Sequence, residues 1–178
     1  MSLTPTPFDS DAPMGAKRPI IRRNPDDVDE VEMIEATWGS NPRFSDGVDY
    51  RFVRSEGKTF PSHRCLMPAS EFHMKVGNKR YRAMLDSGQH FYLAGIWEPP
   101  MGTDFEQPFF RIVTVAANPE VAHYQDRHGA IIYPRQVMQW LDKTVPDDEL
   151  LITPPRHTFI VEEIGRSGAR PEQKKLNL

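Results

Sequence analysis

Short runs of apolar residues, separated by polar stretches rich in turn-forming residues, recur along the whole sequence. This pattern is typical of strands, because a strand needs only a few apolar residues whereas an amphipathic helix needs a longer pattern of period 3.6. The segments 91–97 and 109–115 are almost continuously apolar and predict central strands. Further strands are predicted at 20–21, 32–38, 64–74, 79–85, 130–133 and 158–163.

Two local signals add a hairpin and a helix to this prediction. Asp86-Ser87-Gly88 lies between the runs 79–85 and 90–97, and this turn chemistry predicts that the two runs pair as a β-hairpin. From residue 134 to residue 142 the apolar side chains share one helical face, and Pro134 suits a first helical turn. The expected fold class is therefore α+β, strand-dominated, with one or two helices.

The two ends of the chain differ in character from the middle. Residues 1–17 contain several prolines and acids but few apolar side chains, so they predict an irregular amino-terminal arm. Residues 18–165 form the expected single compact domain, and residues 166–178 predict a flexible, solvated tail. The 17 prolines are about twice the usual share and argue against a helical bundle, because proline interrupts helix interiors.

Composition and charge exclude several classes of protein. With 22 Lys+Arg against 25 Asp+Glu the net charge is −3, so nucleic-acid binding would require a local basic groove. No apolar run approaches the roughly 18 residues of a membrane span, and no membrane partner is expected. The single cysteine, Cys65, excludes an internal disulfide framework and favours a reducing, cytoplasmic location.

His63, Cys65 and His73 are the residues that most resemble metal ligands or a nucleophile with its base. Their spacing matches no zinc motif, and Pro68 is expected to interrupt the strand that would place them on one face. Cys65 is flanked by residues typical of a core strand, so we expect a buried structural thiol rather than a nucleophile. Neither a metal site nor a cofactor is predicted.

Basic residues gather around positions 17–23 and 75–82, and single arginines lie along the segments that are expected to be ordered. Together with aromatic residues such as Trp38, Phe52 and Tyr124, these cations would suit a phosphate-binding groove with stacking side chains. Ordinary surface charge is the default explanation of any one of them, and composition alone leaves the groove as an open alternative.

Seven short motifs follow one another in a fixed order along the chain. They are 38–39 (WG), 54–56 (RSE), 60–69 (FPSHRCLMPA), 94–98 (AGIWE), 113–118 (VTVAAN), 126–127 (DR) and 138–142 (MQWLD). In this order they resemble the blocks WGLIP, NAR-S-E, RCLIPA-x-GFYEW, LAGLWE, T-x-AN and H-x-RMP of the SOS response-associated peptidase (SRAP) family. The resemblance covers about residues 18–165.

This resemblance implies a compact β-rich fold with a positively charged groove for single-stranded DNA. In the family, the cysteine that follows the initiator methionine joins covalently to the ring-opened aldehyde of an abasic site and forms a thiazolidine. An Asn, a Glu and a His around the groove assist this chemistry. The same cysteine is linked to self-processing peptidase activity.

All four of these family positions carry another residue in this chain. The second residue is Ser2 rather than Cys, and Phe52 stands at the Asn position of the NAR-S-E block. By ungapped counting, Met74 stands at the Glu position and Gln125 at the His position. A hydroxyl forms no stable thiazolidine, and neither Phe nor Met offers a group for proton transfer. The resemblance therefore implies a site that has lost its chemistry.

Three nearby side chains are candidate substitutes for the missing groups. Glu71 lies three residues before Met74, and His123 and His128 flank Gln125. On a strand, His123 would share a face with Gln125, whereas Glu71 would face away from Met74. His123 is therefore the better candidate of the two.

The part of the family pattern that is retained concerns DNA binding. Arg54 and Arg127 stand at the two arginine positions, and the resemblance implies that both contact phosphates. Trp38 and Asn118 also match family positions, where a structural role and a DNA-binding role are both open.

Three functional hypotheses follow, and the first is favoured. It is a SRAP-like protein that keeps the fold and binds single-stranded DNA but has lost the cross-linking chemistry. The second is an active enzyme on abasic DNA whose native amino terminus lies ahead of the present start. The third is a scaffold that holds a protein or small-molecule partner in the former catalytic pocket, which Phe52 and Met74 make more apolar.

Overall fold

Eleven strands hydrogen-bond into one sheet in the computed structural model, which describes residues 4–13, 15–39, 51–100 and 107–166. Two short α-helices and two 3₁₀ turns accompany them, and no helix in these ranges is long and apolar enough to cross a membrane. The elements are β1 (Thr6–Asp9), β2 (Lys17–Asn24), β3 (Asp27–Trp38), β4 (Phe52–Arg54), β5 (Arg64–Val76), β6 (Lys79–Leu85), β7 (Phe91–Glu98), β8 (Phe109–Ala116), η2 (Val121–His123), β9 (Arg127–Gly129), β10 (Ile131–Ile132), η3 (Pro134–Gln136), α1 (Val137–Asp142), α2 (Asp147–Leu150) and β11 (Phe159–Arg166). The strand-dominated α+β prediction is confirmed.

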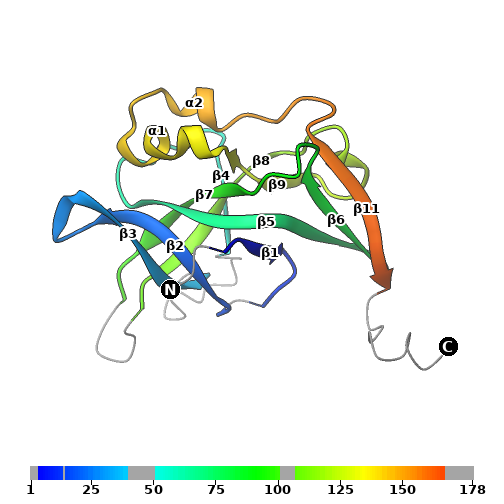
Figure 1. Cartoon of the computed structure of the whole chain (residues 1–178), viewed down its shortest axis with the longest axis horizontal. Coiled ribbons are helices and arrows are strands. Elements are labelled where there is room, and N and C mark those ends of the chain that lie inside the picture. Colours follow the sequence, from blue (N-terminus) through cyan, green and yellow to red (C-terminus); the bar gives the residue numbers. More distant parts are fainter. Residues whose placement is uncertain (1–3, 14, 40–50, 101–106, 167–178) are drawn as a thin grey trace.

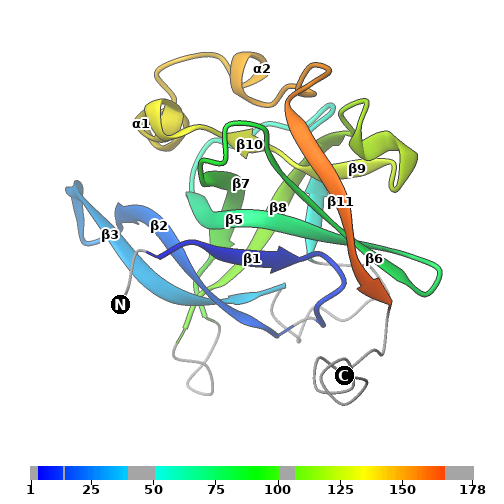
Figure 2. The same cartoon turned by 45° about the vertical axis from the view of Figure 1, so that its right-hand side comes forward.

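Five of these strands close into a ring of main-chain hydrogen bonds. β7 pairs with β8, β8 with β3, β3 with β2, β2 with β5, and β5 returns to β7. All of these pairings are antiparallel except that of β3 with β8. Each strand of the ring thus has two bonded neighbours, which protects its edges. In Figures 1 and 2, β5 crosses the centre of the molecule.

β5 is long enough to serve two different parts of the sheet. Its residues 64–69 pair with β7, and its residues 72–76 pair with β6, which in turn pairs with β11. The predicted hairpin of 79–85 with 90–97 is therefore wrong, because these strands bond to different halves of β5. The predicted turn is present, with the Gly88 N–H donating to Leu85 O at 2.9 Å, but it leads the chain from the stretch of β5 that pairs with β6 to the stretch that pairs with β7.

β5 also runs straight through Pro68, where the sequence predicted a break. Pro68 pairs in register with Tyr92 of β7, and its carbonyl accepts a hydrogen bond from Arg18 Nη2 at 3.2 Å. The N–H that proline lacks would point to the same side as this carbonyl. On that side β5 bonds to β2 up to residue 66 and to β1 from residue 69, so Pro68 lies where the neighbour changes. The strand therefore continues without losing a ladder bond.

The amino-terminal segment is more regular than its composition predicts. Within residues 1–17, β1 runs parallel to β5 with Phe8 opposite Phe72, and β2 begins at Lys17. Main-chain bonds to an edge of β5 require no alternation of apolar residues, and Phe8 alone anchors the strand in the core. The expected irregular arm is corrected accordingly. The expected tail lies outside the described residues from position 167 onward.

The core has two parts, which lie on opposite faces of β5 and β7. Met67 and Leu93 belong to the part that the ring encloses, whereas Leu66 and Ala94 belong to the part that lies under α1. A strand buried on both faces is apolar at nearly every position, which explains the composition of the 91–97 run.

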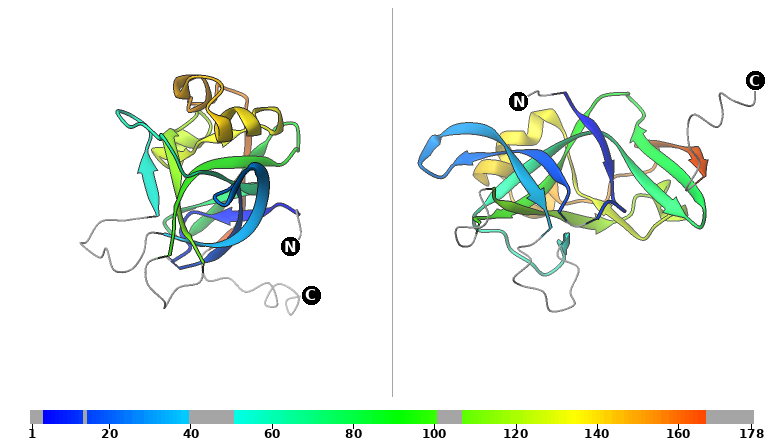
Figure 3. Two further views of the ribbon diagram at one scale, coloured as in Figure 1. Left: turned by 90° about the vertical axis from the view of Figure 1, so that its left-hand side faces the viewer. Right: turned by 90° about the horizontal axis from the view of Figure 1, so that it is seen from below.

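The predicted helix at 134–142 is confirmed as the turn η3 followed by α1, and it covers one side of the sheet (Figure 3). Trp140 is completely buried, and its Nε1 donates a hydrogen bond to Cys65 O at 2.9 Å. The guanidinium of Arg64 lies 4.2 Å from a Trp140 ring centroid and pairs with Asp147 at 2.6 Å. One buried aromatic and one buried cation thus join the helices to β5.

Gly95 of β7 leaves no room for a side chain. A Cβ there would lie 2.9 Å from Arg111 O, which is main chain, and 3.0 Å from Cys65 Sγ. We expect Gly95→Ala to lower the free energy of unfolding by about 1–3 kcal/mol, measured by urea titration. Gly129→Ala is the control and should cost less, because its Cβ would meet only side-chain methyl groups. A wild-type midpoint for Gly95→Ala would contradict this packing.

Candidate functional site

A pocket of about 520 Å³ opens between β4, β9 and the segment that follows β1. β8 lies between β4 and β9 and bonds to both, so three separate parts of the chain meet here. The size falls in the range of small-molecule and nucleotide sites. The residues that line the pocket are Phe8, Ser10, Asp11, Arg51, Phe52, Arg54, Phe72, Leu93, Thr114, Gln125, Arg127, His128 and Gly129.

Two of the four altered family positions, Phe52 and Gln125, line this pocket. Met74 is buried in the core, on the same face of β5 as Phe72, which does line the pocket. Ser2 lies outside the described residues. The structure thus brings Phe52 and Gln125 together and places Met74 next to a residue of the pocket wall.

Gln125 stands just after η2, where its backbone N–H donates to Val121 O at 3.1 Å. Its half-buried side-chain amide has no hydrogen-bond partner among the residues that the structure describes. An amide offers one acceptor and two donors but no proton that titrates. Gln125 is therefore equipped to bind a polar edge of a ligand and unable to act as the histidine of the family.

Arg127 lines the pocket with most of its guanidinium already bonded. Its Nη1 and Nη2 donate to the two carboxylate oxygens of Glu56 at 2.8 and 2.6 Å, and its Nε donates to Thr114 Oγ1 at 3.0 Å. These hydrogen bonds from Arg127 lower the pKa of the Glu56 carboxyl to about 2, so the pair stays charged at neutral pH. Glu56 thus occupies the fork that the family resemblance assigns to a phosphate.

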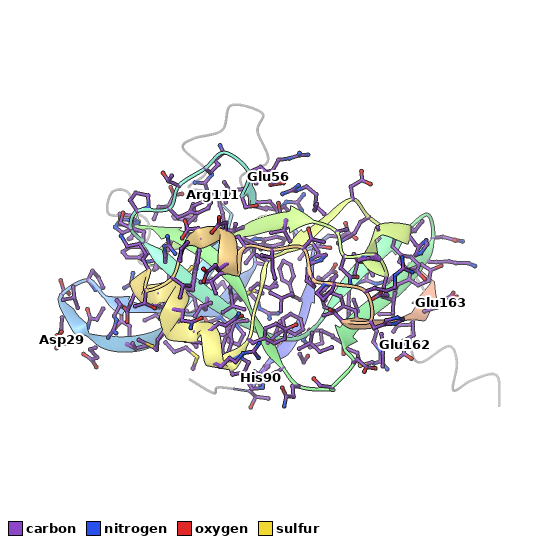
Figure 4. The ribbon with its side chains drawn as sticks, turned by 90° about the horizontal axis from the view of Figure 1, so that it is seen from above. Asp29, Glu56, His90, Arg111, Glu162 and Glu163 are labelled. Carbon is purple, nitrogen blue, oxygen red and sulfur yellow. The ribbon has the colours of Figure 1, made fainter. Side chains whose placement is uncertain are left out.

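Glu56 is exposed at the edge of the molecule beside β4, well away from Glu162 and Glu163 of β11 (Figure 4). Its side chain is 58% exposed, whereas that of Arg127 is 18% exposed. An exposed carboxylate is readily hydrated when it leaves its partner. Glu56 therefore orients Arg127, but separating the two side chains costs little free energy.

Arg54, at the end of β4, is exposed and has no hydrogen-bond or ion-pair partner within the described ranges. Arg51, which precedes β4, holds its guanidinium 5.8 Å from the Phe52 ring centroid and donates to Ala12 O at 2.9 Å. Among the arginines of the described lining, Arg54 is therefore the one whose donors are available to an anion.

His128 has both ring nitrogens engaged inside the fold. Its Nδ1 lies 2.8 Å from Gly129 O, and its Nε2 accepts a hydrogen bond from the Asn118 N–H at 3.2 Å. The ring also stacks on Phe72 with centroids 5.5 Å apart. Burial lowers the pKa of His128 to about 4, so the imidazole is neutral at neutral pH. It therefore supports the pocket wall and does not shuttle protons.

Glu71 and His123, the other candidate substitutes, do not line the pocket. The Glu71 carboxylate lies 2.6 Å from His73 Nε2 and 3.8 Å from Arg82 Nη1, on the face of β5 opposite Phe72. His123 is exposed at the end of η2. Their positions give no support to a rescued acid–base site.

Trp38 and Asn118 are built into the fold and do not present a surface to DNA. Trp38 is 1% exposed, donates from Nε1 to Arg51 O at 2.9 Å, and packs edge-on against Phe52 with centroids 5.3 Å apart. Asn118 is completely buried, and its side chain hydrogen-bonds to the main chain at 2.9 and 3.1 Å. Both residues hold the segments that form the pocket walls.

His63, Cys65 and His73 have different surroundings in the structure. Cys65 is completely buried, and burial raises the pKa of its thiol far above the ordinary value. His63 stacks on Trp97 with centroids 4.1 Å apart, and His73 pairs with Glu71. Cys65 is thus a structural thiol, as its sequence context predicts.

Two features of the pocket were not predicted from the sequence. Ser10 and Asp11 line it from a segment that was expected to be irregular. Glu56 pairs with Arg127 across 71 residues of sequence. Glu56 belongs to the RSE motif, but only the parallel pairing of β4 with β8 and the antiparallel pairing of β8 with β9 bring the two residues together.

The protein is a strand-dominated domain in which five strands close into a ring and an arginine-lined pocket lies beside β8. The family model described as SOS response associated peptidase (SRAP) matches residues 10–165. The chain belongs to the SRAP family, and the resemblance in its motifs is confirmed.

Solved structures share this fold at low sequence identity. A protein from Bordetella bronchiseptica is 18% identical with a TM-score of 0.67, over 88% of this chain and 90% of that one. A second, phage-related protein from the same species is 19% identical with a TM-score of 0.64, over 86% and 80%. A protein from Bacteroides thetaiotaomicron is 20% identical with a TM-score of 0.63, over 90% and 76%. No curated protein matches the sequence.

The buried His128 makes the stability of the protein depend on pH. Its folded pKa is about 4, below the ordinary value of 6.5 that applies to the unfolded chain. Between these two values the unfolded state binds a proton that the folded state does not. The free energy of unfolding therefore decreases as the pH falls through this window, by about 1.4 kcal/mol per pH unit at most.

We expect His128→Asn, although less stable at pH 7, to lose this contribution to the slope between pH 6.5 and pH 4. The measurement is urea unfolding at a series of pH values. His123→Asn, which removes an exposed histidine, should keep the wild-type slope. If His128→Asn kept that slope as well, His128 would not be buried as a neutral ring.

Proposed function

We propose that this protein binds single-stranded DNA in the pocket between β4 and β9 and does not join covalently to abasic sites. The observation that carries the proposal is that one pocket holds the half-exposed ring of Phe52 and the guanidinium of Arg54, which has no partner among the described residues. A cation next to an aromatic ring is the combination that holds the phosphate and the base of a single strand. Membership of the SRAP family supports the choice of DNA over other polyanions.

The loss of cross-linking rests on the chemistry of the lining residues. In the described part of the chain no thiol lines the pocket, and the single cysteine of the sequence is buried elsewhere. Phe52 and Gln125 carry no titratable group, and His128 stays neutral with both nitrogens bonded. A nucleophile and a proton carrier are both needed to open and trap the sugar aldehyde. A reducing, cytoplasmic location is part of this proposal, because Cys65 is a free thiol.

The pocket is also consistent with a small-molecule ligand. It keeps a volume of about 520 Å³ rather than being filled by the protein's own side chains. Buried Phe8, Phe72 and Leu93 supply the apolar surface that such ligands use. Failure to bind DNA in the experiment below would favour this second candidate.

The DNA-binding proposal is tested by titrating a labelled single strand at 50 and 200 mM salt. We expect Arg54→Ala to weaken binding about tenfold at the lower salt, as for one charge-assisted contact. The slope of log affinity against log salt should fall by about 0.7, because one phosphate contact is lost. Arg156→Ala is the matched control, since Arg156 is exposed and does not line the pocket.

Glu56→Gln should act in the opposite direction to Arg54→Ala, because it releases the fork of Arg127 for a phosphate. Tighter binding with a steeper salt slope is the expected result. Absence of any wild-type binding at 50 mM salt would overturn the DNA proposal. An unchanged affinity in Arg54→Ala would show that the strand lies elsewhere.

The absence of cross-linking is tested by incubating the protein with single-stranded DNA that carries one abasic site, followed by denaturing electrophoresis. We expect no heat-stable band of protein joined to DNA, because no described residue supplies a reactive thiol at the pocket. Such a band would instead support an active enzyme, and peptide mapping of the adduct would identify the residue responsible.

A further inference from the structure

We propose that the pocket accepts an intact nucleobase of the bound strand, and that Gln125 recognises the edge of that base. The inference rests on the proposed DNA binding and names the chemical class of group that enters the site. It differs from recognition of an abasic site, in which no base is present to be recognised.

The apolar floor of the pocket is suited to a flat ring. Phe8, Phe72 and Leu93 are 4%, 3% and 1% exposed, so they form a preformed surface. Phe52 is only half-buried, and it is held at 5.3 Å from Trp38 in an edge-on contact that leaves its ring in a defined orientation. A base stacked on such a ring displaces water from apolar surface, whereas a bare sugar would leave that surface wet.

The amide of Gln125 supplies the polar complement to this surface. It carries a donor and an acceptor side by side, and neither has a partner among the described residues. Adenine presents the matching pair, an exocyclic amino group beside a ring nitrogen, and glutamine is a known reader of that edge. The backbone N–H of Gln125 is bonded to Val121 O, so the main chain that carries the amide is fixed.

The charges around the pocket direct the base inward and the backbone outward. Arg54 lines the pocket with free donors and is exposed, so it can hold a phosphate at the surface. Asp11 also lines the pocket and is likewise exposed, and its carboxylate disfavours a phosphate while accepting a hydrogen bond from an amino group of a base. The apolar interior at Phe8, Phe72 and Leu93 therefore fits a neutral base better than any part of the sugar–phosphate chain.

The test compares short single strands that differ only in their bases. One probe of about six nucleotides carries tetrahydrofuran, a stable abasic sugar, at every position, and a second carries one central adenine in the same frame. A third probe of the same length carries a base at every position. Phosphate charge is equal in all three, so fluorescence anisotropy reports the contribution of the base alone.

We expect the single adenine to raise the affinity of the wild-type protein about tenfold over the fully abasic strand. Gln125→Leu should lose most of this preference, measured as the ratio of its affinities for the adenine probe and the fully abasic probe. Gln125→Asn should restore part of it, because the amide is retained on a shorter side chain. Gln89→Leu is the matched control, since Gln89 is exposed and does not line the pocket.

The outcomes separate this inference from the proposal on which it rests. Equal binding of the abasic and the adenine probes would overturn base recognition and leave DNA binding intact. A preference that survives in Gln125→Leu would overturn the role of Gln125. Failure of all three probes to bind would overturn both proposals together. Equal thermal midpoints of the variants would show that each is folded.

Discussion

The need of β5 for hydrogen-bond partners along both edges organises the whole molecule. A strand of 13 residues presents more backbone N–H and C=O groups than one neighbour can satisfy, and burial makes every unpaired group costly. β5 therefore bonds to β1, β2, β6 and β7 along different stretches. Both faces of β5 are buried as well, because Met67 packs inside the ring and Leu66 lies under α1. The pocket inherits its rigid wall from this strand through Phe72.

Two of the titratable side chains at the site are held by pairing or by burial. Arg127 is held by Glu56 and Thr114, and His128 is confined in its neutral form between Gly129 and Asn118. The described lining also holds the guanidinium of Arg54, the half-buried ring of Phe52, the amide of Gln125 and the carboxylate of Asp11. A guanidinium, a phenyl ring and an amide transfer no protons near neutral pH but can stack and form hydrogen bonds. These properties support the proposed binding of a ligand in this pocket.

Periodicity predicted the strands and the helix well, since apolar runs report burial directly. It failed where the partner of a strand had to be chosen, because the turn at residues 86–88 has hairpin chemistry whichever strand the chain joins next. The predicted break at Pro68 was wrong for a related reason, because a missing N–H matters only where a neighbouring strand needs it as a donor. The order of the motifs predicted that Phe52, Gln125, Arg54 and Arg127 belong to one site, and all four line the pocket. No motif predicted that Ser10 and Asp11 line it too.

By itself the sequence determined the family and the strand-rich class, because these depend on which residues are present and in what order. Only the tertiary structure decided that Trp38 and Asn118 are buried, that Glu56 pairs with the guanidinium of Arg127, and that Arg54 has no partner in the part of the chain that the structure describes. The reason is physical. Whether a charge is paired or a ring exposed depends on neighbours that lie tens of residues away, and those neighbours are chosen by the closure of the sheet.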